Sequence, residues 1–387
     1  MPKKNKTRVS KSVVDKEEAR AVSRVILEDG YLGMGKEVQK FEEDLQKFLK
    51  TNRKVTCVNS GTAALHLAVA SITEPGDEVL VQSITYLSSF QAISAAGAVP
   101  VACEINPKTM TIDLKDAEKR ITTKTKVIMP VHYSGDPGNL DEIYKFAKKH
   151  NLRVIEDAAH AFGTLYNKKL IGSFGDIVCF SFDGIKNITS GEGGAVVTAD
   201  LDVSQYIQDA RLLGVQKDTE KRYKGLRSWK FDVTHQGYRY HQSNLFAAIG
   251  RVQLRKFSLF KKARQSLAKR YFKLLRNIKG IEVFERNYDN VVPHIFPIKV
   301  LNNKRDELRQ YLSDNNIESG IHYYPNHLLT YYRRPGFKLP ITEKIYSQLL
   351  TLPLHPDLTK VQQDNIVNLI KKFIKRTIYE KRNNKNF

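Results

Sequence analysis

An acidic residue and a lysine each follow an apolar run in the middle of the chain, where buried strands are predicted to end. The run 152–155 is closed by Glu156 and Asp157, and the run 177–182 is followed by a turn and then by Lys186. Ligand groups collect at the carboxyl ends of strands in open α/β sheets. A lysine can form a Schiff base with pyridoxal phosphate at such a place, while an aspartate keeps the pyridine nitrogen protonated. Asp157 and Lys186 are therefore the candidate catalytic residues.

Each of these two residues also has an ordinary explanation. A lysine after a strand is most often a solvated loop residue, and an aspartate after a strand often caps the next helix. The pair alone does not separate the two interpretations, so the rest of the chain has to decide between them.

Glycine and hydroxyl side chains stand at the start of a predicted helix, in residues 59–65, directly after the predicted strand 55–58. The first N–H groups of a helix have no partner within the helix, so such a start can bind an anion. Gly61 and Thr62 are the candidates for this role, although a hydroxyl here can also simply cap the helix. Tyr86 follows the next predicted strand, where an aromatic ring is most often part of the core or the rim.

Short apolar runs alternate with helical segments through the first 250 residues. This alternation predicts an α/β fold with a doubly wound, mostly parallel sheet. Segment 245–278 then has the apolar spacing of a long amphipathic helix, and the residues after it are typical of a smaller α/β domain. We therefore expect a flexible basic tail, a large domain, a linking helix with a small C-terminal domain, and a second basic tail, at residues 1–12, 13–250, 251–380 and 381–387.

The charge of the chain is strongly positive, with 63 Lys and Arg against 41 Asp and Glu and a formal net charge of +22. Such a balance is typical of proteins that bind nucleic acid. The excess is spread out, however, with its densest runs in the tails and around residues 217–230, and no zinc-finger, RNP or basic-zipper pattern accompanies it. We expect a solvated basic surface that also favours a phosphate-rich substrate, and no nucleic-acid partner.

The cysteines and the hydropathy of the chain indicate its cellular compartment and argue against metal-binding and membrane-spanning proteins. Cys57, Cys103 and Cys179 lie far apart in or beside apolar runs, which indicates buried free thiols and a cytoplasmic location. Neither C-x-x-C nor a helically spaced histidine pair occurs, so we expect no metal site. No run of eighteen apolar residues occurs, so we expect no membrane span. The N-terminus is basic and lacks the apolar segment of a secretory signal.

Several short motifs around the two candidate catalytic residues occur together. Residues 156–163 read EDAAHAFG, FSF follows at 180–182, and GEGG stands at 191–194, after Lys186. In this order they resemble the DegT/DnrJ/EryC1/StrS family of sugar aminotransferases, over nearly the whole chain. The resemblance implies a fold type I transferase that depends on pyridoxal 5′-phosphate (PLP), with pyridoxamine phosphate as the half-reaction form. The lysine argues against the dehydratase branch of the family, which has histidine at that position.

The resemblance also assigns a role to each cofactor-binding residue. Asp157 would pair with the pyridine nitrogen, and the ring of Tyr86 would stack on the pyridine face. Lys186 would hold the cofactor and move a proton between the substrate carbon and the cofactor carbon. His160 would lie near the ring hydroxyl, and the phosphate would be bound by Gly61, Thr62 and Ser181.

A motif in the second half of the chain departs from the commoner family pattern. Residues 237–244 read GYRYHQSN, where G-Y-N-Y-R-M-S-N is more usual. Arg239 replaces an asparagine that in the family often reaches across a dimer to the neighbouring cofactor phosphate, and arginine could do so with a longer arm and a charge. His241 replaces the arginine of the pattern. This variant resembles the subgroup that makes 4-amino-4,6-dideoxyglucose (viosamine).

Five further residues are candidates for contact with the substrate. Two of them follow a predicted strand at the same rim as Asp157, and three belong to a segment that resembles the family loop returning to the active site. These residues are His132 and Tyr133, and His322, Tyr323 and His327.

Together these features predict an aminotransferase that works as a homodimer. It would transfer the amino group of L-glutamate to C4 of a UDP- or dTDP-linked 4-keto-6-deoxyglucose, for a surface glycan such as lipopolysaccharide. Amination at C3 by the same fold remains open, because the orientation of the substrate decides between the two carbons. The remaining alternative is a basic nucleic-acid-binding or regulatory protein that keeps the fold without turnover; the intact Asp157 and Lys186 pair argues against it.

Overall fold

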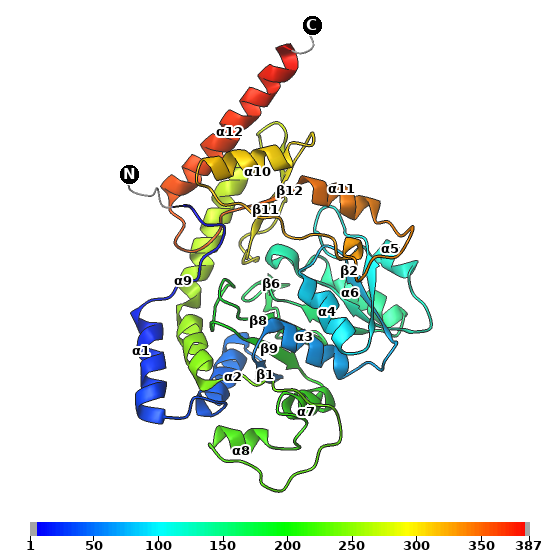
Figure 1. Cartoon of the computed structure of the whole chain (residues 1–387), viewed down its shortest axis with the longest axis vertical. Helices are drawn as coiled ribbons and strands as arrows, with labels where there is room; N and C mark the ends of the chain where they lie inside the picture. The colour runs from blue at the N-terminus through cyan, green and yellow to red at the C-terminus, as the bar shows by residue number, and fades with distance from the viewer. Residues whose placement is uncertain (1–5, 384–387) are drawn as a thin grey trace.

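A computed structural model describes the backbone of residues 6–383 and the side chains of residues 6–376, and its centre is a seven-stranded sheet (Figure 1). The spatial order of the strands is β1-β9-β8-β5-β4-β2-β3. Strand β9 runs antiparallel to both of its neighbours, and the other six strands run parallel to one another. The strands are β1 (Lys54–Val58), β2 (Glu78–Gln82), β3 (Val99–Cys103), β4 (Thr125–Met129), β5 (Arg153–Asp157), β8 (Ile177–Ser181) and β9 (Gly194–Thr198). The predicted doubly wound, mostly parallel sheet is confirmed.

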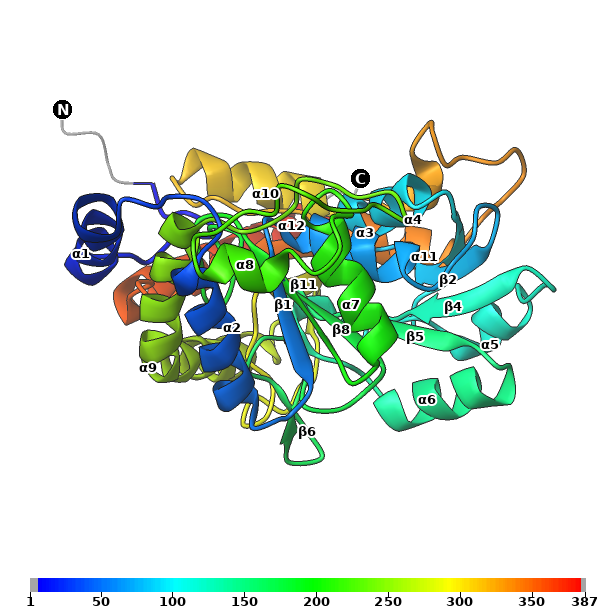
Figure 2. The same ribbon diagram turned by 90° about the horizontal axis from the view of Figure 1, so that it is seen from below.

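Helices cover both faces of this sheet (Figure 2). Neighbouring residues of a strand point to opposite faces, so that Val154 packs in one apolar cluster and Ile155 in the other. The first cluster also holds side chains of α2 (Lys36–Leu49) and α6 (Leu140–Lys149), and the second holds those of α3 (Gly61–Ala70), α4 (Leu87–Ala95) and α7 (Leu201–Ala210). Both faces are buried, which is why these strands read as continuous apolar runs in the sequence.

A smaller domain follows at the end of the long helix α9 (Asn244–Leu275), which passes from the large sheet to the second one (Figure 1). The second sheet is antiparallel, in the order β10-β11-β12. Its core cluster also includes side chains of α9. The elements here are β10 (Ile281–Val283), β11 (Phe296–Val300), β12 (Leu349–Leu352), α10 (Arg305–Asp314), α11 (Pro340–Gln348) and α12 (Lys360–Asn383). The predicted domain boundary at residue 250 falls inside α9.

The expected flexible tail at residues 1–12 is wrong for the part that the structure describes. Thr7 donates its N–H to the carbonyl of Asn316 (2.9 Å) and accepts from the N–H of Glu318 (2.9 Å). The carbonyl of Val9 accepts from the N–H of Leu354 (3.0 Å). Backbone groups of the small domain thus bind this polar segment. Their residues are far from it in the sequence, so no local sequence pattern predicts the contact. At the other end, α12 runs to Asn383, so the second expected tail is partly helical; residues 1–5 and 384–387 lie outside the described chain.

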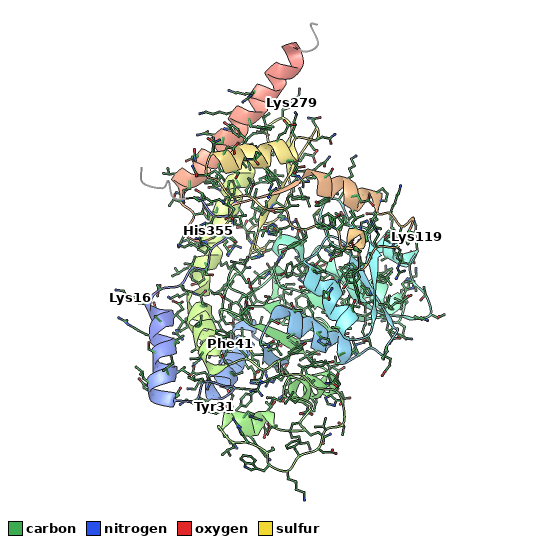
Figure 3. The ribbon with its side chains drawn as sticks, in the orientation of Figure 1. Lys16, Tyr31, Phe41, Lys119, Lys279 and His355 are labelled. Atoms are coloured by element: carbon green, nitrogen blue, oxygen red, sulfur yellow. The ribbon has the colours of Figure 1, made fainter. Side chains whose placement is uncertain are left out.

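Several short helices and strands lie outside the two main sheets, and charged side chains lie on the surface of the molecule. Among the labelled residues of Figure 3, Lys16, Lys119 and Lys279 lie at the periphery, whereas Phe41 is fully buried between α2 and the sheet. The short elements are α1 (Lys16–Arg24), a π-helix (Val25–Asp29), α5 (Leu114–Glu118), a 3-10 turn (Tyr133–Gly135), β6 (Leu165–Tyr166), β7 (Lys169–Leu170), α8 (Thr219–Tyr223) and a second 3-10 turn (Asn326–Leu328). No helix within residues 6–383 is long and apolar enough to cross a bilayer.

Candidate active site

A cavity of about 410 Å³ lies where the parallel strands of the large sheet end. Its walls come from the turns after β1, β2, β4, β5 and β8, together with His294 before β11 and the loop between α10 and α11. Nine of the residues singled out in the sequence meet here: Gly61, Thr62, Tyr86, Asp157, His160, Ser181, Lys186, His322 and Tyr323. The carboxyl ends of neighbouring parallel strands form one edge of a sheet, which brings together residues that lie far apart in the sequence.

Asp157 is the last residue of β5 and is 4% exposed. Its Oδ2 accepts a hydrogen bond from the hydroxyl of Ser89 (2.8 Å), and its Oδ1 accepts from the N–H of Ala159 (3.2 Å). The hydroxyl of Thr85 lies 2.8 Å from that of Ser89. The carboxylate is thereby held in one orientation. Ser89 was not predicted from the sequence, although it is a hydroxyl residue in the first turn of a helix after a strand end, as Thr62 is.

Lys186 follows β8 in a tight turn, in which its N–H donates to the carbonyl of Asp183 (3.0 Å). Burial lowers the pKa of its amine to about 8, and the positive charge of Arg264 acts in the same direction. Asp157 and Asp183 oppose this shift. With this pKa the amine is neutral in roughly one molecule in ten at pH 7, far more often than a solvated lysine, and a nucleophile requires the neutral form.

His160 shares a hydrogen bond with Tyr323, and a backbone N–H at its other ring nitrogen fixes the tautomer of the histidine. The N–H of Ser134 donates to His160 Nδ1 (3.3 Å), so we assign the ring proton to Nε2. Nε2 lies 3.0 Å from the hydroxyl oxygen of Tyr323 and donates to it. The hydroxyl hydrogen of Tyr323 is then left to donate to another group. Burial, and then the charge of Lys186, lower the pKa of His160 well below 6.5, so the ring is neutral.

The start of α3 forms an anion cradle against the end of β8. Ser60 caps the helix by accepting from the N–H of Ala63 (3.1 Å), and the N–H groups of Gly61 and Thr62 make no hydrogen bond within the described chain. A Cβ on Gly61 would lie 2.7 Å from the Cβ of Ser181, so glycine permits this close approach. Two free N–H groups and a hydroxyl at a helix N-terminus fit a phosphate.

The last glycine of the GEGG motif permits a second close approach, that of β9 to the turn at Ser60. Gly194 begins β9 and pairs with both Val58 of β1 and Ser181 of β8. A Cβ on Gly194 would lie 2.5 Å from the carbonyl oxygen of Ser60. Glycine at this position therefore allows β9 to lie directly beside the turn that forms the cradle.

Three substrate candidates do not line the cavity, and the corresponding predictions are wrong. His132 is fully buried 3.2 Å from Glu156 Oε2. Glu156 and Asp157 are neighbours in β5, so they point to opposite faces, and His132 lies on the face away from Asp157. Tyr133 is also fully buried, and its hydroxyl donates to the carbonyl of His322, so it supports the cavity loop from behind.

His327 is the third of these residues. Its Nδ1 lies 2.7 Å from the hydroxyl of Ser83, and its Nε2 lies 3.1 Å from Glu343 Oε1. Both ring nitrogens are therefore engaged in joining α11 to the large domain. His322 and Tyr323, five and four residues earlier, do line the cavity, and His322 Nδ1 lies 2.9 Å from the hydroxyl of Thr351.

Arg239 is exposed and does not line the cavity of its own chain. Its carbonyl accepts from the side-chain amide of Asn59 (3.4 Å), and the N–H of Asn59 donates to the carbonyl of Tyr240 (2.7 Å). This segment therefore lies beside the end of β1, and its arginine side chain is free to contact another molecule. The role of Arg239 in binding a phosphate stays a prediction.

Several other polar residues complete the lining of the cavity. His294 packs its ring 4.4 Å from that of His160, and Glu192 is a carboxylate whose pKa is raised by burial. Among the described residues no arginine lines the cavity, and no cluster of His, Cys, Asp or Glu is suited to hold a metal ion. The polar lining residues that were not predicted from the sequence are Ser60, Thr85, Ser88, Asp183, Glu192 and His294.

Several known proteins are similar to this chain over nearly its whole length. Spore coat polysaccharide biosynthesis protein SpsC of Bacillus subtilis is 35% identical over 374 residues, 94% of this chain and 96% of SpsC. The structure of Helicobacter pylori PseC, an aminotransferase involved in the biosynthesis of pseudaminic acid, matches 96% of this chain and 100% of its own, with a TM-score of 0.88 and 26% identity.

A further solved structure bears on the cofactor. Spr1654 of Streptococcus pneumoniae, described as a sugar aminotransferase, matches in its PLP-form with a TM-score of 0.87 and 27% identity, over 96% of this chain and 99% of its own. It was also solved in a PMP-form. The model of the DegT/DnrJ/EryC1/StrS aminotransferase family matches residues 13–371. The chain therefore belongs to the DegT/DnrJ/EryC1/StrS family of sugar aminotransferases, whose enzymes use PLP.

Proposed function

We propose that this chain is a PLP-dependent aminotransferase that moves the amino group of L-glutamate to C4 of a nucleotide-linked 4-keto-6-deoxyglucose. The observation that supports the proposal best is one cavity holding three groups that PLP needs. These are an amine with a pKa of about 8 on Lys186, the oriented carboxylate of Asp157, and the anion cradle at Gly61 and Thr62.

PLP, when bound, supplies an electron sink for the carbon that exchanges its amino group. The Lys186 amine would attach the cofactor and then carry the proton between the two reacting carbons. Asp157 would accept a hydrogen bond from the protonated pyridine nitrogen, while Ser89 holds the carboxylate in place. Ser181 and the two free N–H groups of α3 would bind the phosphate, and the exposed ring of Tyr86 would cover the cofactor.

We further propose that a second copy of the chain completes the site. The cofactor phosphate, the glutamate carboxylates and the nucleotide diphosphate are all anions, yet the cavity holds the carboxylates of Asp183 and Glu192 and is lined by no arginine of the described chain. Arg239 is exposed nearby. Trp229, in the preceding basic segment, is 89% exposed, as expected for a side chain that another subunit covers.

Two further proposals specify the substrate: the sugar carbon that receives the amino group and the nucleotide that carries the sugar. The C4 assignment, and with it the viosamine product, rests on Arg239 and His241 in the GYRYHQSN motif; C3 amination is the alternative within the family. The likeness to SpsC supports a product that enters a polysaccharide. We place the reaction in the cytoplasm, where the three buried free cysteines would stay reduced.

A half-reaction followed by absorbance tests this function. Purified protein is loaded with PLP and titrated first with glutamate, then with UDP- and dTDP-linked 4-keto-6-deoxyglucose. We expect glutamate to convert the band of the lysine-bound cofactor to that of pyridoxamine phosphate, and one of the two sugars to reverse the change. NMR of the product then distinguishes C4 from C3.

A matched pair of variants controls the experiment. Lys186→Ala should lose the band of the lysine-bound cofactor, whereas Lys169→Ala, on an exposed residue of β7, should keep it. A Lys186→Ala protein that still responds to glutamate would contradict the assignment. If the wild type does not attach PLP at all and instead binds DNA or RNA in a salt-sensitive manner, the catalytic proposal is wrong.

A further inference from the structure

A buried arginine without an acidic partner lies behind the catalytic lysine. Arg264, in the middle of α9, is 2% exposed, and no carboxylate of the described chain forms an ion pair with it. Arg211 is the contrasting case, since its buried guanidinium pairs with Glu42 at 2.6 Å. Burial lowers the pKa of Arg264 to about 10, so it still carries its charge at neutral pH.

Backbone carbonyls take the place of a carboxylate around Arg264. Its Nη1 donates to the carbonyl oxygen of His294 (3.0 Å) and, at longer range, to those of Pro293 and Leu354 (both 3.4 Å). Its Nη2 donates to the carbonyls of Ile185 (3.4 Å) and Lys186 (3.5 Å). Burying a charge is costly unless hydrogen bonds compensate it, so a side chain in this position needs an explanation.

These five carbonyls belong to three separate segments. Ile185 and Lys186 lie in the turn after β8 of the large domain, Pro293 and His294 precede β11, and Leu354 follows β12. The segments before β11 and after β12 belong to the small domain, and His294 also lines the cavity. One guanidinium on the linking helix therefore holds the lysine turn and the edge of the small domain in a common position.

We propose that Arg264 is a positioning residue, whose buried guanidinium sets the place of the Lys186 turn relative to the small domain and supplies a fixed positive charge behind the Lys186 amine. The part of the proposal that concerns turnover rests on the proposed aminotransferase function. The geometry does not depend on that function. A positive charge here favours the neutral, reactive form of the amine, and the pKa shifts of Lys186 and His294 both include a lowering by Arg264.

The titration of Lys186 has to be considered with all the groups that act on it. Two carboxylates favour its charged form, those of Asp157 at the end of β5 and Asp183 in its own turn. Arg264 on α9 disfavours that form. Three neutral imidazoles complete the surroundings, those of His160, His294 and His322.

The test measures the Lys186 amine without any cofactor. The apoprotein is acetylated over a range of pH, and the rate at Lys186 is read by peptide mass spectrometry. We expect a midpoint near pH 8 in the wild type and a midpoint roughly half a pH unit or more higher in Arg264→Gln, because a fixed positive charge has been removed. Arg255→Gln is the control; this arginine is exposed on the same helix and, within the described chain, donates only to the carbonyl of Arg251.

A second variant covers the case in which Arg264→Gln does not fold. Arg264→Lys can reach fewer carbonyls with its single amine, so we expect a kcat reduced roughly tenfold or more, with a smaller change in KM. An unchanged midpoint in folded Arg264→Gln overturns the proposal, as does an unchanged kcat in Arg264→Lys. Failure of the wild type to attach PLP would instead count against the proposed function, since the acetylation result stands without it.

Discussion

Asp157, which we propose as the partner of the pyridine nitrogen, is held by a neighbour that does not line the cavity. Ser89 is fully buried and donates to Asp157, and the hydroxyl of Thr85 lies next to it. A carboxylate held by a hydroxyl and a backbone N–H keeps one orientation, so its free lone pairs point in a fixed direction. The position of a bound pyridine nitrogen would thus be set by a short chain of hydroxyls from the β2–α4 turn.

Ser89→Ala should weaken PLP binding roughly tenfold, because a hydrogen bond to a charged group is lost at a buried site. The dissociation constant can be measured by fluorescence titration of the apoprotein. Ser94→Ala is the matched control, since Ser94 lies on the same helix and its hydroxyl contacts Tyr332 instead. Equal affinities for the Ser89→Ala variant and the wild type would show that Asp157 is oriented by other contacts.

The pH dependence of cofactor attachment follows from the lowered pKa of Lys186. The amine is charged and unreactive below its pKa of about 8 and neutral above it, so the rate of attachment should rise with pH and level off above about pH 8. Stopped-flow absorbance of apoprotein mixed with PLP measures this rate. A rate that keeps rising toward pH 10.5, the usual value for lysine, would mean that Lys186 is solvated in the free protein.

At the scale of helices and strands, a buried polar network joins α8 to α2. Arg211 donates to Glu42 Oε1 (2.6 Å) and to the carbonyl of Cys57 (2.6 Å), and Tyr223 of α8 donates to the other oxygen of Glu42. The network fixes the base of the exposed segment that begins at residue 224. Its members come from α2, β1, α8 and the end of α7, so it forms only when the large domain is folded.

Glu42→Ala should lower the free energy of unfolding by about 3–5 kcal/mol, because it leaves the buried guanidinium of Arg211 without its counter-charge. Chemical denaturation monitored by circular dichroism measures the change. The control is Glu43→Ala on the same helix; Glu43 is exposed, and a change within about 0.5 kcal/mol is expected. A similarly small effect of Glu42→Ala would mean that water reaches the network.

At the scale of the whole molecule, the charge of the chain and the charge of the cavity are opposite in sign. The net charge is +22, while the cavity is lined by three carboxylates, Asp157, Asp183 and Glu192, and one lysine. Attraction of the anionic substrates that we propose would thus be left to the outer surface. The negatively charged lining of the cavity is also the reason why we assign a phosphate contact of Arg239 to a second copy of the chain.

Complementation between two inactive variants tests this cross-subunit role. Lys186→Ala and Arg239→Ala should each be strongly impaired, but a mixed dimer contains one cavity with Lys186 from one subunit and Arg239 from the other. Co-expression with two different tags isolates that dimer, and we expect it to regain up to half of the wild-type activity. If Arg239 acts on its own cavity, every site in the mixed dimer stays defective and no activity returns.

The fold was predictable because its strands are buried on both faces. The predicted runs 152–155 and 177–182 coincide within two residues with β5 and β8, since a central parallel strand needs apolar side chains throughout. The direction of a strand, by contrast, could not be predicted from its apolar run. The run that becomes β9 has no feature that marks it as antiparallel; the close approach of Gly194 to Ser60, seen only in the folded sheet, accompanies that arrangement.

The sequence by itself determined the chemistry of this protein, and the tertiary structure decided which residues take part in it. Asp157, Lys186 and Gly61 follow strands whose carboxyl ends must meet, so local patterns were enough to bring them together. His132 and His327 met the same criteria and point elsewhere, because the direction of a side chain depends on the register and partners of its strand or loop. The contacts of Ser89, His294 and Arg264 cross the fold, and only close packing of distant segments creates them.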